Sequence, residues 1–147
     1  MGKLLGIATR VKTKSPMDEH ASATVSFSEG VLSDSRGRKA GGKRQVTVMS
    51  KEAWDIVCKE LGSEIAWTTR RANFFIEGVP LINTTGQILK IGSLELEITG
   101  ELVPCNRMDE QFDGLTKILG QDWRGGVTCK VKKEGSTSLN DEVSLIY

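Results

Sequence analysis

Cys105 is the residue of this chain whose type and position best suit chemistry. The sequence around it reads Val103-Pro104-Cys105-Asn106-Arg107, directly after an alternating pattern that predicts a strand over Leu94–Thr99. A loop at a strand end exposes a side chain while the scaffold holds it in place. A cysteine becomes a nucleophile or a metal ligand as the thiolate, which nearby cations favour. Cys105 is therefore a candidate catalytic residue and metal ligand, although a buried, inert cysteine is the commoner case.

The other two cysteines lie on predicted apolar faces. Cys58 falls on the apolar stripe of a helix and Cys129 on the apolar side of a strand, so both are predicted to be buried and slow to react. Three widely spaced cysteines favour a reducing compartment, the cytoplasm, over a disulfide framework. With a single histidine, His20, which we interpret as a solvated loop residue, a four-ligand zinc site is not expected.

Two basic segments offer positive charge. Ser33–Arg44 contains three glycines, five basic residues and no large apolar side chain. Its composition favours a solvated loop, and the alternative is an anion site in which backbone amides and cations meet a phosphate. The GxxxxGK[ST] spacing of a P-loop is absent. Arg70-Arg71-Ala72-Asn73 precedes a predicted strand and is either rim decoration or a further anion contact.

Length and charge exclude some classes of protein. The 147 residues are most simply one domain over 1–147. Twenty basic and nineteen acidic residues leave a net charge of +1, which argues against a strongly electrostatic nucleic-acid binder. No apolar run approaches the ~20 residues that a membrane-spanning helix needs, and the N-terminus has no signal-peptide pattern. Neither a nucleic acid nor a membrane is therefore an expected partner.

Hydrophobic periodicity predicts a mainly β fold. Ser50 is a suitable N-cap for a helix that ends at Gly62, and a second short helix should end at Gly120. No alternating strand and helix units occur, so we expect a closed or partly closed β-barrel with two or three short helices. The main strands are predicted at Gln45–Met49, Asn73–Ile76, Ile88–Ile91, Leu94–Thr99 and Val127–Lys132.

Eight separated segments resemble the molybdenum cofactor sulfurase C-terminal (MOSC) domain, in its small stand-alone bacterial form. They occur in the order of that family and cover nearly the whole chain. Two positions depart from the family pattern: Ser33 precedes Asp34 in place of glycine, and Asn140 stands where glycine is usual. The matching segments are Gly30–Asp34 with Arg36-Gly37, Gly42–Thr47, Arg71–Phe74, Gly86–Gly92, Glu97–Gly100, Pro104–Glu110, Trp123–Val127 and Asn140–Val143.

The resemblance implies a β-barrel and a relation to the molybdenum cofactor, molybdopterin. It implies that Cys105 ligates molybdenum or carries sulfur, and a thiolate is a suitable ligand for a soft metal. The sulfurases also have a pyridoxal-phosphate domain, but no pyridoxal-phosphate site is visible in this sequence. Because the pterin carries phosphate, the expected cofactor contacts are Arg36, Lys43, Arg44, Arg71, Asn73, Arg107 and Arg124.

Three functions remain open at this point. The first is a module that binds the cofactor or carries a persulfide on Cys105, with a sulfur donor as partner. The second is a molybdenum-dependent reductase of N-hydroxylated compounds that works with redox partners. The third is a cofactor-free barrel that binds a protein. Under the first two functions, we expect a cluster of side chains near Cys105 at one end of the barrel. Its members are Arg71, Asn73, Arg124 and Lys43 or Arg44.

Overall fold

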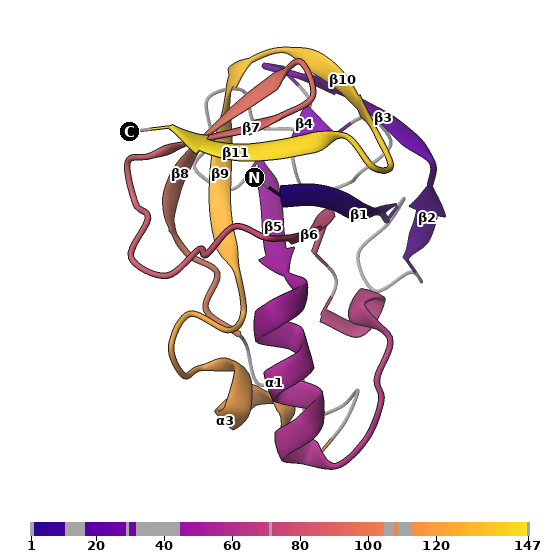
Figure 1. Cartoon of the computed structure of the whole chain (residues 1–147), viewed down its shortest axis with the longest axis vertical. Coiled ribbons are helices and arrows are strands. Elements are labelled where there is room, and N and C mark those ends of the chain that lie inside the picture. The colour runs from indigo at the N-terminus through magenta and orange to yellow at the C-terminus, as the bar shows by residue number, and fades with distance from the viewer. Residues whose placement is uncertain are drawn as a thin grey trace.

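The computed structural model of the chain describes residues 2–10, 17–28, 30–31, 45–70, 72–104, 108 and 113–146. Seven strands form a barrel in the order β11-β7-β8-β9-β5-β6-β1, and pairing of β1 with β11 closes it (Figure 1). Neighbouring strands are antiparallel except β5 and β6, which are parallel. The barrel strands are β1 (Gly2–Thr9), β5 (Val46–Ser50), β6 (Phe74–Glu77), β7 (Ile88–Ile91), β8 (Leu94–Glu101), β9 (Val127–Lys133) and β11 (Glu142–Ile146).

In the part of the chain that the structure describes, four more strands lie outside the closed ring. β2 (Asp18–His20) pairs with β1, and a three-stranded sheet has the order β10-β3-β4. The strands of this sheet are β3 (Ser22–Ser26), β4 (Gly30–Val31) and β10 (Gly135–Ser138).

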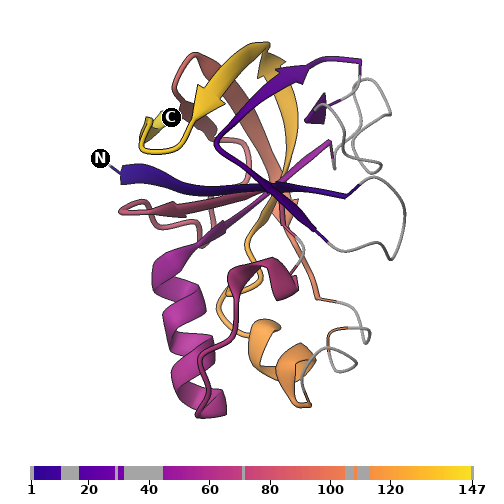
Figure 2. The ribbon, with the colours of Figure 1, turned by 90° about the vertical axis from the view of Figure 1, so that its right-hand side faces the viewer.

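The helices extend from one end of the barrel (Figures 1 and 2). Helix α1 (Lys51–Leu61) follows β5 directly, because the Ser50 hydroxyl accepts a hydrogen bond from the Ala53 amide at 3.2 Å. The helix ends at Gly62, which adopts the left-handed conformation with φ 71°. The 3-10 helix η1 (Trp67–Arg70) then leads the chain to β6, and α3 (Leu115–Leu119) packs beside α1.

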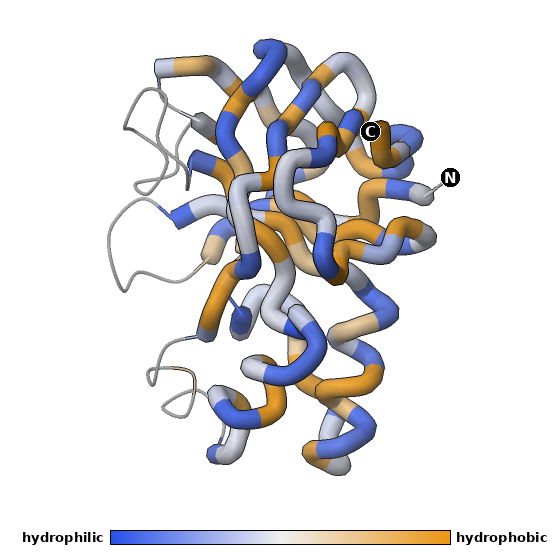
Figure 3. The backbone as a smooth tube through the Cα atoms, turned by 90° about the vertical axis from the view of Figure 1, so that its left-hand side faces the viewer, coloured by the Kyte–Doolittle hydropathy of each residue, from blue (hydrophilic) through white to orange (hydrophobic). Residues whose placement is uncertain are grey.

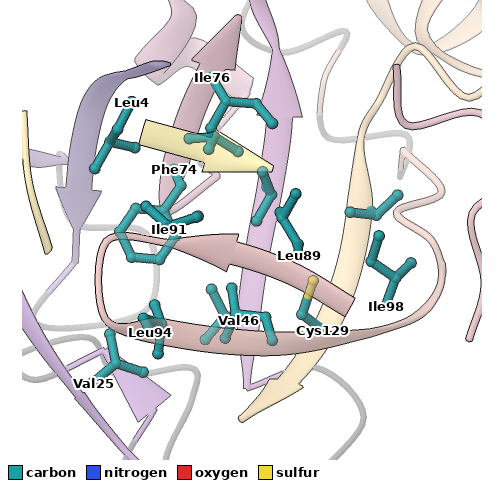
Figure 4. Close-up of a cluster of buried hydrophobic side chains, with 14 of the residues drawn as sticks. Leu4, Val25, Val46, Phe74, Ile76, Leu89, Ile91, Leu94, Ile98 and Cys129 are labelled. Atoms are coloured by element: carbon teal, nitrogen blue, oxygen red, sulfur yellow. The ribbon is translucent and has the colours of Figure 1, made fainter. Parts of the chain in front are cut away.

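Side chains that alternate between the two faces of the strands form two separate hydrophobic cores. One face of β5, β8 and β9 points into the barrel, where Val46, Ile98 and Cys129 lie among other buried apolar side chains (Figure 4). The opposite face of β5 and β6 is covered by the helices. The alternation of hydrophobic and hydrophilic residues is visible along the chain in Figure 3. The buried side chains of this second core are Met49, Trp54, Val57, Ala72, Met108, Leu115 and Leu119.

The structure confirms the predicted mainly β barrel and all five predicted main strands, with ends that differ by at most two residues. His20 was expected to lie in a solvated loop, and this expectation is wrong. His20 is a strand residue, and its Nε2 lies 2.7 Å from the Thr9 hydroxyl. Short edge strands with exposed side chains lack an apolar face, so no alternation marks them in the sequence. No described helix is long and apolar enough to cross a membrane.

Candidate functional site

Arg70 joins the segments that flank Cys105. Its side chain is only 6% exposed at the end of η1. The Nη2 atom donates a hydrogen bond to the Leu102 carbonyl at 2.8 Å, and Nη1 lies 4.0 Å from the Met108 sulfur. Leu102 and Met108 are each three residues from Cys105 in the sequence. One guanidinium therefore holds the chain both before and after the candidate cysteine.

The same guanidinium holds the turn before β9. Arg70 Nε donates to the Gly125 carbonyl at 3.2 Å. A Cβ atom at Gly125 would lie 2.6 Å from the Leu102 carbonyl oxygen and 3.0 Å from Arg70 Nη2, so only glycine permits this close approach. Three segments that are far apart in the sequence thus meet at one end of the barrel: the end of η1, the end of β8 and the start of β9.

The turn itself has an unusual backbone. Asp122 and Trp123 both adopt positive φ angles, 50° and 59°, and the Arg124 amide donates to the Gln121 carbonyl at 2.9 Å. This is the geometry of a type I′ turn, which normally takes asparagine or glycine at its central positions. A bulky residue such as tryptophan is rare there and costs conformational energy.

Arg124 is anchored to helix α1. Its guanidinium is ion-paired with Glu60 and lies 3.9 Å from the Asp122 carboxylate, with 13% of the side chain exposed. The sequence predicted this arginine as a phosphate contact. A phosphate at Arg124 would compete with the two carboxylates, so this contact stays a prediction.

Asn73 is buried between three strands. Its Oδ1 accepts hydrogen bonds from the Thr47 amide at 3.1 Å and the Thr47 hydroxyl at 3.3 Å, and its Nδ2 donates to the Ala8 carbonyl at 3.2 Å. The side chain thereby ties β5 and β1 to the start of β6. Its predicted role as a cofactor contact is untested, but its position shows a structural role that the sequence did not reveal.

The remaining predicted site residues lie outside the described part of the chain, and their convergence stays a prediction. The described residue that follows one of them, Gln45, is nevertheless held in place by hydrogen bonds of its side chain. Gln45, which follows Arg44, donates from Nε2 to the Phe27 carbonyl at 2.6 Å and accepts from the Val131 amide at 3.0 Å. The residues in question are Arg36, Lys43, Arg44, Arg71, Cys105 and Arg107.

The two described thiols differ in exposure. Cys129 is fully buried in the barrel core, and this burial raises the pKa of its thiol. Cys58 was expected to be buried, but it is only half-buried. It lines an open surface pocket of about 370 Å³ with Asp55, Lys59, Gly62, Ser63 and Glu64. The helical stripe predicted its face correctly, because Cys58 packs against the second core and its Sγ donates to the Ile65 carbonyl at 3.8 Å.

Sequence reasoning missed Arg70. The Arg70-Arg71 pair looked like two equivalent rim cations, because nothing in the sequence separates a buried arginine from an exposed one. The only indirect signal was Gly125-Gly126, where glycine admits close backbone contacts. Among the residues that the structure describes, no group of three or more histidine, cysteine, aspartate or glutamate side chains is placed to hold a metal ion.

Comparison with known proteins identifies the family of this barrel. The MOSC domain model matches residues 33–144, and the chain belongs to the MOSC domain family, which is associated with the molybdenum cofactor. None of the curated proteins compared with the chain matches it significantly.

Solved structures share the fold. YuaD from Bacillus subtilis superimposes with a TM-score of 0.82 at 17% identity, covering 100% of this chain and 97% of that one. YiiM from Geobacillus stearothermophilus gives 0.78 at 13% identity, covering 100% and 76%, and YiiM from Escherichia coli gives 0.73 at 15% identity, covering 99% and 70%. At these identities, the likeness concerns the fold alone.

Proposed function

We propose that this protein binds the molybdenum cofactor, with the Cys105 thiolate as the ligand of molybdenum. The observation that carries the proposal is the Arg70 contact set, which joins both flanks of Cys105 to the turn before β9. Membership of the MOSC family supports the same cofactor. A thiolate is a soft ligand of the kind that such a metal accepts.

The described residues set limits on how the cofactor's phosphate is held. Asn73 already uses its amide to join strands, and Arg124 is engaged by Glu60 and Asp122. A phosphate at Arg124 would therefore share the guanidinium with these carboxylates. When bound, the molybdenum centre supplies redox chemistry, and the chain's own contribution is to ligate it and neutralise the phosphate. We assign most of the phosphate contacts to Arg36, Lys43, Arg44, Arg71 and Arg107.

Cofactor content measured by metal analysis and pterin fluorescence tests this proposal. Wild-type protein from a host that makes the cofactor should contain molybdenum and pterin. Cys105→Ser should lose the molybdenum, whereas the matched control Cys58→Ser should retain it, because Cys58 lies on α1. Absence of both components from the wild-type protein would contradict the proposal, as would equal molybdenum in Cys105→Ser and wild type.

Two further measurements on the same samples separate the other functions. Peptide mass mapping shows whether Cys105 carries a persulfide, which is the sulfur-carrier outcome. Turnover of a hydroxylamine with an added reductant is the reductase outcome. A wild-type protein with neither cofactor nor persulfide is a cofactor-free barrel.

A further inference from the structure

We propose that Glu60 is an internal ligand of Arg124, whose carboxylate competes with a phosphate for the guanidinium and so weakens phosphate binding there. The inference rests on the proposed function in taking a phosphate-bearing molecule as the ligand of Arg124. It assigns a role to Glu60, which is not among the predicted cofactor contacts. The residues that carry it lie in the turn before β9 and in the last turn of α1.

The Arg124 guanidinium is engaged by carboxylates of the protein itself. It is ion-paired with Glu60, and the Asp122 carboxylate lies 3.9 Å away. A carboxylate and a phosphate present their oxygen atoms to the planar fork of a guanidinium in the same way, so one anion can take the place of the other. Glu60 thus occupies Arg124 as a phosphate would.

The exposure of the two partners determines which of them can move. The Arg124 side chain is 13% exposed, whereas the Glu60 side chain is 44% exposed. The backbone at Arg124 is held in place, because the carbonyl of the next residue, Gly125, is bound by Arg70. Glu60 can turn its carboxylate into water at the low cost that is typical of partly exposed ion pairs. A phosphate from solution can therefore take its place without moving the backbone.

The position of Glu60 on α1 is locally unfavourable. Glu60 lies in the last turn of this helix, which ends at Leu61. The negative end of the helix dipole favours cations there and disfavours a carboxylate. The pairing with Arg124 therefore offsets a cost that α1 alone would impose on this glutamate.

The turn that carries Arg124 is locally unfavourable as well. Asp122 and Trp123 precede it with φ angles of 50° and 59°, a conformation that is costly for a bulky residue. Residues held in such conformations concentrate at binding sites, where the surrounding contacts fix them. Two separate departures from local preference thus meet at the Glu60–Arg124 pair, as expected where a contact serves binding and not only stability.

The experiment measures the affinity of inorganic phosphate at constant ionic strength, from the NMR chemical shifts of the Arg124 Nε–H group and the Gly125 amide. Glu60→Gln removes the charge of the side chain and keeps its shape. We expect this variant to bind phosphate about threefold to tenfold more tightly than the wild type. The matched control is Asp55→Asn, which removes a carboxylate of the same helix that pairs with Lys51. It should change the affinity by less than about twofold, because salt screens charges that do not contact the ligand site.

Removal of the guanidinium shows whether the effect arises at Arg124. Arg124→Met in the Glu60→Gln background should abolish the gain in phosphate affinity, with the Gly125 amide as the reporter. Equal phosphate affinities in Glu60→Gln, Asp55→Asn and the wild type would overturn the inference. A gain that survives Arg124→Met would overturn it too, since the phosphate would then bind elsewhere.

The phosphate titrations and the cofactor measurements together separate this inference from the proposed function. Tighter phosphate binding by Glu60→Gln, in a protein that never acquires molybdenum, would sustain the inference and refute the proposed function. Normal molybdenum loading of the wild type, with phosphate affinities that do not respond to Glu60→Gln, would do the reverse.

Discussion

At the scale of single residues, Asn73 shows how one buried amide organises strands that are distant in sequence. Its side chain bonds Thr47 on β5 and Ala8 on β1, while its backbone amide and carbonyl bond the same two residues. These bonds hold the start of β6, at Phe74, against the middle of the parallel strand β5. A buried amide in such a position holds the barrel together whether or not it also contacts a ligand.

Asn73→Ala should destabilise the protein by about 2–4 kcal/mol. The change removes hydrogen bonds to two strands and leaves the Thr47 amide and the Ala8 carbonyl without this partner in a buried place. Urea unfolding measures this loss of stability. The control is Gln121→Ala, which replaces an exposed side chain. A loss below about 0.5 kcal/mol, the usual range of surface substitutions, would show that the amide is not a structural bridge.

Arg71→Ala tests the proposed phosphate contacts. An arginine–phosphate contact is charge-assisted and often bidentate, so its loss should cost on the order of 1.5–3 kcal/mol. Cofactor retention should therefore weaken roughly tenfold to a hundredfold, with thermal unfolding unchanged. Lys90→Ala, which removes an exposed cation from β7, is the matched control. Equal retention in both variants would identify Arg71 as a solvated rim residue.

At the scale of elements, the turn before β9 combines two left-handed residues with two tightly packed glycines. Gly126 has a φ of 97°, and a Cβ there would overlap the Val48 carbonyl on the neighbouring strand β5. The Leu102 amide donates to the Gly126 carbonyl at 2.8 Å, which ties this turn to the end of β8. The sequence Trp123-Arg124-Gly125-Gly126 therefore fixes the end of β8 and the start of β9 relative to the middle of β5.

Gly126→Ala should destabilise the fold by about 2 kcal/mol or more, because it adds left-handed strain to a backbone clash. Gly120→Ala, in the same part of the chain, should change stability by less than about 1 kcal/mol. Thermal unfolding measures the stability of both variants and so compares the two substitutions directly. Similar melting temperatures would mean that the turn shifts to accept a side chain.

Elements with a strong periodic pattern were predictable from sequence, and contacts between elements were not. The α1 boundaries followed from Ser50 and Gly62, and β8 and β9 followed from their alternation. The polar strands β2 and β10 carry no such pattern and form because neighbouring backbones need partners. Arg70 escaped prediction because its role depends on segments more than thirty residues away in the sequence. The placement of the Cys105 segment itself remains a prediction.

At the scale of the whole molecule, the barrel closes through its first and last strands. Gly2 and Lys3 of β1 pair with Val143 and Glu142 of β11, so the seven-stranded ring forms only when both ends of the chain are in place. Inside the ring, Cys129 is surrounded by apolar side chains (Figure 4). A titratable group in that position couples the stability of the entire barrel to pH.

Cys129 should make the folded protein less stable at alkaline pH. Burial raises the pKa of its thiol in the folded state, whereas in the unfolded chain the pKa is about 8.5. Below that pH both states hold the proton, and the stability contribution is fully present. Above it only the unfolded state releases the proton, so the free energy of unfolding falls by about 1.4 kcal/mol per pH unit.

Urea unfolding at pH 8 and pH 10 measures this effect as a difference between variants. The wild type should lose about 2 kcal/mol more than Cys129→Val, which keeps an apolar side chain of similar size but cannot ionise. Cys58→Ser should behave like the wild type, since it leaves Cys129 in place. Subtracting the variants cancels the contributions of the other groups that titrate in this range. An equal loss in wild type and Cys129→Val would show that the core admits the thiolate, or that the barrel opens locally at alkaline pH without unfolding.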